Sequence, residues 1–440
     1  MNRTSIRVVS NPRRAVPRTD RLLAEPKLQE ASAALGPTLV KDAVYAAQQR
    51  VRDGALDPDD VLAAVVESLP TTATSLRPVL NATGVVVHTN LGRAPLSRAA
   101  VQALVLAAGN TDVELDLDTG RRGRRGAGAV EALLAAVPEA EAAHVLNNGA
   151  AALALLATAY AGREVVVARG ELVEIGDGFR IPELLTAAGL VLREVGTTNR
   201  VRLEDYTDAV GDETAFVLKV HPSNFVVSGF TSSVPVEALA GLAVPLVVDI
   251  GSGLLGPHRR LPDEPDAATV LRRGADLVTA SGDKLLGGPQ CGIMLGRADL
   301  VHRLRRHPVA RAFRVDKLTL AALEATLRGP VPPVHRALDS DVGDLCRRAE
   351  DIARRLDAMG TSAQPVESTA AVGGGGAPGV DLASAAVALP VSLAEALRLG
   401  DPAVMGRVER DRLLLDLIAI DPDDDATLLQ AVHAATSPAR

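Results

Sequence analysis

The sequence predicts an α/β protein with a mainly parallel central sheet, a small helical N-terminal domain and a C-terminal α/β domain. Three observations indicate this class. Short β-branched runs alternate with helical stretches through the middle of the chain, helical periodicity precedes them, and mixed strand and helix patterns follow near the end. We therefore expect domains at residues 1–72, 73–329 and 330–440.

Length and charge limit the classes of function. The 440 residues, 47% of them hydrophobic, are enough for two or three domains with large cores. The net charge of −7 argues against indiscriminate nucleic-acid binding, and binding to DNA is not expected. Residues 1–30 nevertheless hold seven Lys and Arg against three Asp and Glu, which fits either an RNA contact or a solvated terminus.

The numbers of cysteine and aromatic residues exclude further classes of function. Cys291 and Cys346 form neither a disulfide framework nor a zinc pattern, so we expect a cytoplasmic protein without a metal site. No apolar run is long enough to cross a bilayer, and a membrane function is not expected. With no Trp, three Tyr and five Phe, an aromatic platform for stacked RNA bases is not expected either.

The helical pattern of the N-terminal domain covers residues 20–68 and breaks at Gly36-Pro37 and at Gly54, before a polar connection at 71–79. Apolar strands then alternate with helices, which implies a sheet covered on both faces. The predicted strands are 85–88, 164–170, 190–196, 215–221, 245–251 and 275–280.

The C-terminal part begins after a helix at 319–329 that ends at Gly329. Residues 330–335 resemble a linker, and 341–360 have the pattern of an amphipathic helix. The glycine-rich segment AVGGGGAPG (371–379) precedes an apolar segment at 387–393 and a last strand at 413–420. Its glycines are not spaced as in a dinucleotide fingerprint, so a tight hairpin is favoured over a phosphate site.

A lysine and a carboxylate follow two successive predicted strands, at the sheet edge where ligands of such folds lie. Asp249 ends one buried strand, and Lys284 follows the next within ASGDKLLGGPQCG (280–292). This pair fits pyridoxal 5′-phosphate, in which the lysine forms the Schiff base and an acid keeps the pyridinium nitrogen protonated. A loop lysine beside a Gly-Gly-Pro turn is the alternative.

The cofactor phosphate would need backbone N–H groups at the start of a helix, where anions bind. LNNGAAALALLATAY (146–160) supplies a polar turn that leads into a strong helix. Ordinary helix capping explains the two asparagines equally well. The candidate phosphate-binding residues are Asn147, Asn148, Gly149 and Ala150.

Seven segments in order resemble the bacterial selenocysteine synthases, which are L-seryl-tRNA(Sec) selenium transferases of the fold-type-I aminotransferase class that use pyridoxal phosphate. The resemblance runs from about residue 15 to near the C-terminus. The segments are NATGVVVHTNLGRAPLS (81–97), RGELVEIGDGFRIPELL (169–185), EVGTTNR (194–200), KVHPSNFVVSGFT (219–231), VDIGSGLL (248–255), TASGDKLLGGPQCG (279–292) and HPVARAFRVDKLTLAALEATL (307–327).

The resemblance implies roles for individual residues. Lys284 would carry the cofactor with Asp283 beside it in the site, and Arg93, Arg311 and Arg314 would form a basic pocket for selenophosphate. Guanidinium groups suit such oxyanions because they present permanently charged planar forks. His221, at another strand end, either contacts the ring or substrate or is a satisfied structural histidine.

Three features stay open. Residues 121–125 (RRGRR) fit a cofactor-phosphate contact, an RNA backbone contact or an exposed loop, and residues 302–314 taken alone resemble a solvated basic helix face. Asp177 stands where the family tends to have Gly, and Gly149 stands where a further Asn or Ala is expected.

The implied activity is conversion of seryl-tRNA(Sec) to selenocysteinyl-tRNA(Sec). Lys284 would remove the α-proton, water would be eliminated through an aminoacrylyl intermediate, and selenophosphate would add selenium. The resemblance also implies self-association into dimers and rings of dimers. The alternatives are a lyase or transferase of the same family that acts on a small amino acid or amino sugar, and a non-catalytic RNA-binding scaffold. The basic, helical N-terminal domain favours the tRNA substrate.

Overall fold

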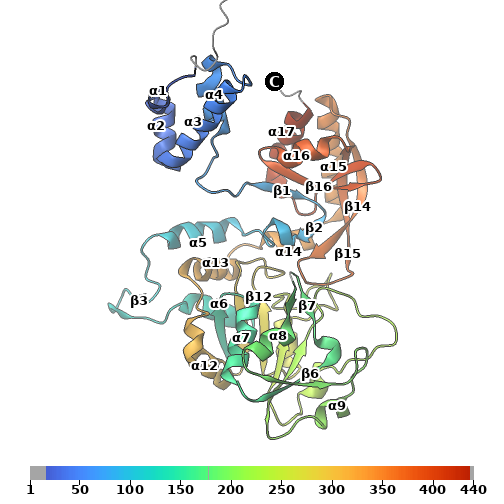
Figure 1. Cartoon of the computed structure of the whole chain (residues 1–440). Helices are drawn as coiled ribbons and strands as arrows, with labels where there is room; N and C mark the ends of the chain where they lie inside the picture. Colours follow the sequence, from blue (N-terminus) through green and yellow to red (C-terminus); the bar gives the residue numbers. More distant parts are fainter. Residues whose placement is uncertain (1–15, 177, 437–440) are drawn as a thin grey trace, which may run out of the picture. The chain divides into compact units, whose positions relative to one another are not determined.

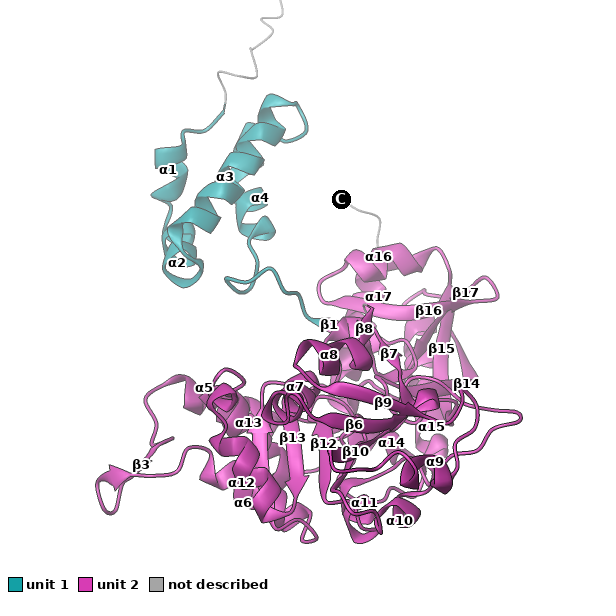
Figure 2. Cartoon of the chain, turned by 60° about the horizontal axis from the view of Figure 1, so that its bottom comes forward, with its two compact units in different colours: residues 1–78 teal, residues 79–440 magenta. Residues whose placement is uncertain are grey.

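The computed structural model describes residues 16–176 and 178–436, and the chain divides into two compact units at Pro78 (Figure 2). The predicted basic segment up to residue 15 and Asp177 lie outside the described residues. No helix in the described ranges is long and apolar enough to cross a membrane.

The first unit is helical, as the sequence predicts for residues 20–68. Its longest helix begins with a proline directly after Gly36 and buries Val40, Val44, Ala47 and Val51, a spacing that places them on one face. The unit therefore has its own small core. Its helices are α1 (Thr19–Leu23), α2 (Pro26–Leu35), α3 (Pro37–Arg52) and α4 (Val61–Ser68).

The second unit contains a seven-stranded sheet with the order β5-β13-β12-β11-β10-β6-β9. The strands pair in parallel except β13, which is antiparallel to both neighbours, so the prediction of a mainly parallel sheet is confirmed. Their bounds are β5 (Ala142–Leu146), β6 (Glu164–Ala168), β9 (Val191–Val195), β10 (Thr214–Val220), β11 (Leu246–Asp249), β12 (Leu277–Ser281) and β13 (Gly292–Gly296).

Helices cover both faces of this sheet (Figure 1). One face packs against α7 (Gly149–Ala159), α8 (Ile181–Ala187) and α12 (Ala298–Arg306). The other packs against α6 (Ala127–Ala136), α10 (Val236–Leu239), α11 (Ala267–Arg272) and α13 (Lys317–Arg328). The remaining helices of this part are α5 (Arg98–Ala108) and α9 (Leu203–Thr207), and its short hairpins are β3 (Leu115–Asp116) with β4 (Arg121–Arg122) and β7 (Glu174–Ile175) with β8 (Phe179–Arg180).

A six-stranded sheet of order β1-β16-β17-β15-β14-β2 forms the rest of the unit. Its strands are β1 (Val79–Ala82), β2 (Val85–Val87), β14 (Gln364–Gly373), β15 (Asp381–Pro390), β16 (Ala403–Glu409) and β17 (Arg412–Asp416). Its helices are α14 (Pro333–Leu338), α15 (Val342–Ala358), α16 (Leu393–Leu399) and α17 (Asp425–Thr436). The predicted hairpin at the glycine-rich segment is confirmed, because β14 and β15 are antiparallel and residues 374–380 join them.

Three details of the strand and linker predictions were wrong. Residues 85–88 do not join the central sheet, because β2 pairs with β14 in the six-stranded sheet. The expected linker at 330–335 ends early, since α14 begins at Pro333. Strands β5 and β13 were not predicted, because the first is alanine-rich and the second is short and bounded by glycines.

Candidate active site

Lys284 lies three residues after β12 in a buried loop. The loop is held by backbone hydrogen bonds on either side of the lysine, from Leu285 N–H to the Ser252 carbonyl (2.9 Å) and from Gly287 N–H to the Lys284 carbonyl (3.0 Å). Only 9% of Lys284 is exposed. Burial lowers the pKa of the Lys284 amine, and the negative charge of Asp249 opposes this lowering.

Asp249 ends β11, which lies beside β12 in parallel register. The Thr279 hydroxyl donates a hydrogen bond to the carboxylate over 2.8 Å. Burial raises the pKa of Asp249, and the Thr279 hydrogen bond and the charge of Lys284 act against that effect. The two strand-end residues that the sequence singled out therefore interact electrostatically. We call the buried surroundings of the Lys284 amine, which include Asp249, Gly251 and Gly375, the lysine pocket.

Backbone approaches the lysine amine closely. A Cβ atom on Gly375 would lie 3.2 Å from Lys284 Nζ, and one on Gly251 would lie 3.9 Å from it. The amine and the Asp249 carboxylate are both desolvated, which is unfavourable unless a ligand provides bonding partners for them. A cofactor with a carbonyl carbon for the amine and a basic ring nitrogen for the acid fits this pair of groups.

The candidate phosphate-binding residues lie at the N-terminus of α7. Asn148 caps the helix, its side-chain oxygen accepting a hydrogen bond from Ala151 N–H over 2.7 Å. A Cβ on Gly149 would lie 2.8 Å from the Ser281 hydroxyl oxygen at the end of β12, so this turn and the strand that precedes Lys284 are in contact.

Arg93 and Asp283 form an ion pair beside the lysine, with 2.7 Å between Arg93 Nη1 and Asp283 Oδ2. Only 10% of the Asp283 side chain is exposed. Arg93 has a φ of +66°, a left-handed conformation that is uncommon for residues other than glycine and that recurs at functional sites. The adjacent Ala94 N–H donates to the Asp283 carbonyl, so backbone and side chain both tie this loop to the lysine segment.

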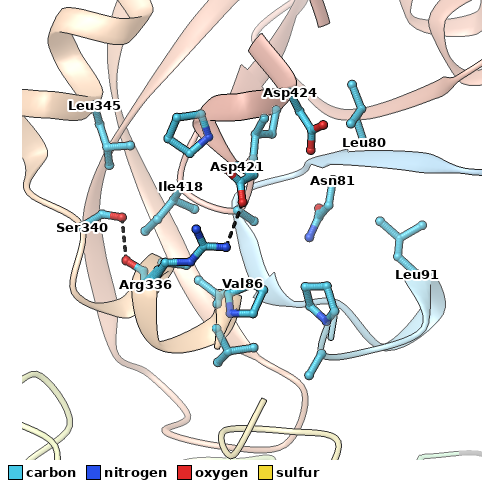
Figure 3. Close-up of a pocket in the computed structure, with 18 of the residues that line it drawn as sticks. Leu80, Asn81, Val86, Leu91, Arg336, Ser340, Leu345, Ile418, Asp421 and Asp424 are labelled. Carbon is cyan, nitrogen blue, oxygen red and sulfur yellow. Dashed lines mark hydrogen bonds and ion pairs between the residues drawn. The ribbon is translucent and has the colours of Figure 1, made fainter. Parts of the chain in front are cut away.

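Arg93 also lines a cavity of about 600 Å³ in the second unit (Figure 3). Its walls come from β1, α14, α15 and the loop before α17, and include Arg336, which pairs with Asp421 over 2.8 Å. Since Arg93 contacts Asp283, this cavity adjoins the lysine pocket.

Arg311 and Arg314 do not line that cavity. They line a different one of about 460 Å³, beside the turn before α7: the Asn147 N–H donates to the Phe313 carbonyl over 3.1 Å. The structure of one chain thus does not bring all three predicted arginines into one cavity. The basic residues of the second cavity are Arg124, Arg125, His144, Arg305, His307, Arg311 and Arg314.

This second cavity is strongly electropositive. Burial lowers the pKa of His144 to about 4, with the charges of Arg305 and Arg124 acting in the same direction. Within the described part of the chain, His144 Nε2, Arg125 Nε and Arg305 Nε are buried without a hydrogen-bond partner. Such unpaired groups are costly, and an oxyanion would satisfy them.

The structure places the two basic segments, residues 121–125 and 302–314, whose roles the sequence left open. Arg124 and Arg125 of the RRGRR segment line the second cavity, whereas Arg121 and Arg122 form the exposed strand β4. Residues 302–314 are not one solvated helix face, since α12 ends at Arg306 and the following residues turn into the cavity wall.

His221 is paired with a residue that the sequence analysis did not identify. His221 Nε2 lies 3.2 Å from Oε2 of Glu264, whose side chain is 1% exposed. Glu264 stands in the irregular segment LPDEPD (261–266), where no periodicity or strand end draws attention to it. Ser223, close to both Gly251 and Gly375, was also missed, although it lies within the segment 219–231.

Comparisons with known proteins agree with this geometry. The sequence profile of the family described as "L-seryl-tRNA selenium transferase" matches residues 79–421, and that of "Selenocysteine synthase N terminal" matches residues 13–52. The chain belongs to the L-seryl-tRNA selenium transferase family. The enzyme named L-seryl-tRNA(Sec) selenium transferase in Desulfovibrio desulfuricans is 42% identical over 97% of this chain and 98% of its own length. The one in Hyphomonas neptunium is 43% identical over 96% and 98%.

Among solved structures, a D-glucosaminate-6-phosphate ammonia-lyase matches with a TM-score of 0.57 at 19% identity, covering 82% of this chain and 96% of that one. At this sequence identity the match is evidence for the fold alone, and it confirms the predicted fold-type-I α/β class. The L-seryl-tRNA selenium transferase family consists of pyridoxal-phosphate-dependent transferases, and the pocket around Lys284 has the groups that this cofactor needs.

Proposed function

We propose that the protein converts seryl-tRNA(Sec) to selenocysteinyl-tRNA(Sec), with selenophosphate as the selenium donor and pyridoxal 5′-phosphate as cofactor. The observation that carries the proposal is the buried Lys284 amine beside the buried Asp249 carboxylate, in a chain of this family. Among the described residues Lys284 is the one lysine that counts as buried, and Asp249 ends the parallel strand next to β12.

Three parts of the pocket would hold the cofactor. Lys284 would bond its carbonyl carbon, Asp249 would face its ring nitrogen, and the N–H groups of the turn at Asn147 to Ala150 would bind its phosphate. When bound, the cofactor supplies an electron sink that makes loss of the serine α-proton feasible. The lowered pKa of Lys284 favours a neutral amine, which is the form able to accept that proton.

Asp283 and Arg93 are assigned to the chemistry next to Lys284. The ion pair places the Asp283 carboxylate, one residue before Lys284, and the Arg93 guanidinium next to the lysine, where they can orient the serine hydroxyl group that leaves as water. In the overall reaction, the serine Cβ–O bond breaks with loss of water and the selenium of selenophosphate forms the new Cβ–Se bond. The Se–P bond then breaks as a water molecule takes up the phosphoryl group, which is released as phosphate.

Arg311 and Arg314 are assigned to the selenium donor. Their cavity has an excess of permanent positive charge. Within the described residues, the buried Nε atoms of Arg125 and Arg305 in its wall have no hydrogen-bond partner. Arg93 lines another cavity in the single chain, so in this proposal the donor-binding arginines come from two cavities.

The helical unit is assigned to tRNA binding. Its exposed basic side chains include Arg50 and Arg52 in the last turn of α3. Phosphate contacts of such residues are salt-dependent, so charge reversal at both positions should weaken tRNA binding and lower its salt dependence, without changing cofactor loading. Unchanged tRNA affinity would remove this assignment.

We also propose that the chain self-associates into dimers, which assemble further into rings, and that it works in the cytoplasm. Large apolar residues are exposed on α5 and on the segment near β3, as is typical of a subunit interface. They are Val101, Val105, Leu106, Leu115 and Leu117. Analytical ultracentrifugation of the purified protein tests this, and a monomer at micromolar concentration would contradict it.

The activity itself is tested with selenophosphate labelled with radioactive selenium. We expect label to appear on seryl-tRNA(Sec) and not on free serine or on an amino sugar phosphate. Label-free tRNA, with release of ammonia from one of the small amines, would favour the lyase alternative. A protein that binds tRNA and takes up no pyridoxal phosphate would favour the non-catalytic scaffold.

A further inference from the structure

The glycine-rich loop between β14 and β15 reaches the lysine pocket from the other sheet. Although residues 374–380 join two strands of the six-stranded sheet, a Cβ on Gly375 would lie 3.2 Å from Lys284 Nζ, and one on Gly376 would lie 2.9 Å from Leu285 Cδ1. The loop is therefore a wall of the lysine pocket as well as a hairpin. Gly375 has a φ of +73° and the non-glycine Ala377 a φ of +46°, so the loop keeps a demanding backbone conformation.

Glu264 holds this loop in place. Its Oε2 accepts a hydrogen bond from Ala377 N–H over 2.7 Å, across 113 residues of sequence. The same oxygen lies 3.2 Å from His221 Nε2, at the end of β10. One carboxylate oxygen thus joins the loop of one sheet to a strand end of the other.

Stability alone does not account for this carboxylate. Glu264 is almost fully buried, and within the described residues its second oxygen, Oε1, has no hydrogen-bond partner. A buried carboxylate with an unsatisfied oxygen is unfavourable compared with an apolar residue of the same size. Its negative charge also acts on the Lys284 amine, in the direction that raises the amine's pKa.

We infer that Glu264 is a positioning residue for the reaction at Lys284: it fixes His221 and the glycine loop in the arrangement that the pocket requires. The inference rests on the proposed function for its kinetic consequences, but not for its structural ones. Glu264 has no place in the proton transfers, and its effect on turnover passes through His221 and the backbone of residues 375–377.

The test compares Glu264→Ala with Ser384→Ala in the full-length, cofactor-loaded protein. The Ser384 hydroxyl is buried in β15 and donates to the Asp416 carboxylate over 2.6 Å, so its removal also deletes a buried hydrogen bond to a carboxylate of this sheet, but away from Lys284. Three quantities are measured: hydrogen exchange of residues 374–378, the visible absorbance of the bound cofactor, and kcat and KM for seryl-tRNA(Sec).

For Glu264→Ala we expect faster exchange in the loop, a shifted cofactor absorbance, and a kcat about 10- to 100-fold lower with little change in KM, as for a misplacement of about 1 Å at a reacting centre. Ser384→Ala should leave all three as in wild type. Adding His221→Ala to Glu264→Ala should cause little further loss, because the two residues act as a unit.

Wild-type exchange and kcat in Glu264→Ala would overturn the inference, as would an equal loss of kcat in Ser384→Ala or a full multiplicative loss in the double variant. If Glu264→Ala does not fold, Glu264→Asp, whose shorter side chain cannot reach both partners, is judged on the same measurements. If wild type transfers no selenium, the proposed function fails, while exchange and absorbance still decide the role of Glu264.

Discussion

Replacing Gly375 with alanine tests whether the glycine loop shapes the lysine pocket. Two effects are expected. An L-residue at a φ of +73° costs about 1–2 kcal/mol of folding stability. In addition, the new methyl group would lie 3.2 Å from Lys284 Nζ and 3.7 Å from both Lys284 Cε and Ser223 Oγ, so the amine or the loop must move by a few tenths of an ångström.

Gly360→Ala is the matched control. Gly360 follows α15 with a φ of +86°, and a Cβ there would meet no atom within 4 Å. Both variants should therefore lose about 1–2 kcal/mol in chemical unfolding. Gly375→Ala alone should bind pyridoxal phosphate more weakly and lose about tenfold or more in kcat.

The assays are urea unfolding, titration of the cofactor by visible absorbance, and selenium transfer to seryl-tRNA(Sec). Equal kcat values for the two variants would show that the loop does not constrain Lys284, and the reasoning about the pocket wall would be refuted. If Gly360→Ala lost as much activity as Gly375→Ala, backbone strain at a positive φ, and not the contact with Lys284, would explain the loss.

Three further predictions follow from buried charges and thiols. Burial raises the pKa of the Asp249 carboxyl in the folded state above its value in the unfolded chain, so the ionised carboxylate destabilises the fold once the pH exceeds the unfolded-state pKa. Asp249→Asn should therefore make the cofactor-free protein more resistant to urea at pH 7, but not near pH 4, and should abolish activity. Equal resistance of the variant and wild type to urea at pH 7 would contradict this. Burial lowers the pKa of the Arg305 guanidinium, so Arg305→Met should leave the free energy of unfolding unchanged or increase it, and should raise KM for selenophosphate. A less stable variant with an unchanged KM would contradict both expectations. Burial raises the pKa of the Cys291 thiol to about 12, so at pH 8 a thiol reagent should label only the partly exposed Cys346 in the folded protein. Cys291 should react once the protein is unfolded. Rapid labelling of both thiols in the native state would contradict this prediction.

Strand-end reasoning from the sequence predicted that Asp249 and Lys284 lie together. Asp249 and Lys284 each follow a continuous apolar run, and parallel pairing of β11 with β12 brings them together as expected. The cap at Asn148 was likewise visible, because a polar turn before a strong helix is a local pattern. These features depend on residues near each other in sequence.

The residues that sequence reasoning missed depend on contacts between distant segments. Glu264 meets Ala377 only because the two sheets pack together, and no spacing in the sequence encodes that contact. The glycine segment was correctly read as a hairpin, but its approach to Lys284 could not be, since it was not known which surface the hairpin faces. The same limit applies to Arg93, which the family resemblance grouped with Arg311, although in one chain the two line different cavities.

The most direct test of the account is to identify the amino acid attached to the tRNA after reaction. Seryl-tRNA(Sec), selenophosphate and pyridoxal phosphate are incubated with wild type or with Lys284→Ala, and the aminoacyl group is released and analysed by mass spectrometry. We predict selenocysteine with wild type and unchanged serine with Lys284→Ala. Unchanged serine with cofactor-loaded wild type, or selenocysteine with the variant, would contradict the central claim.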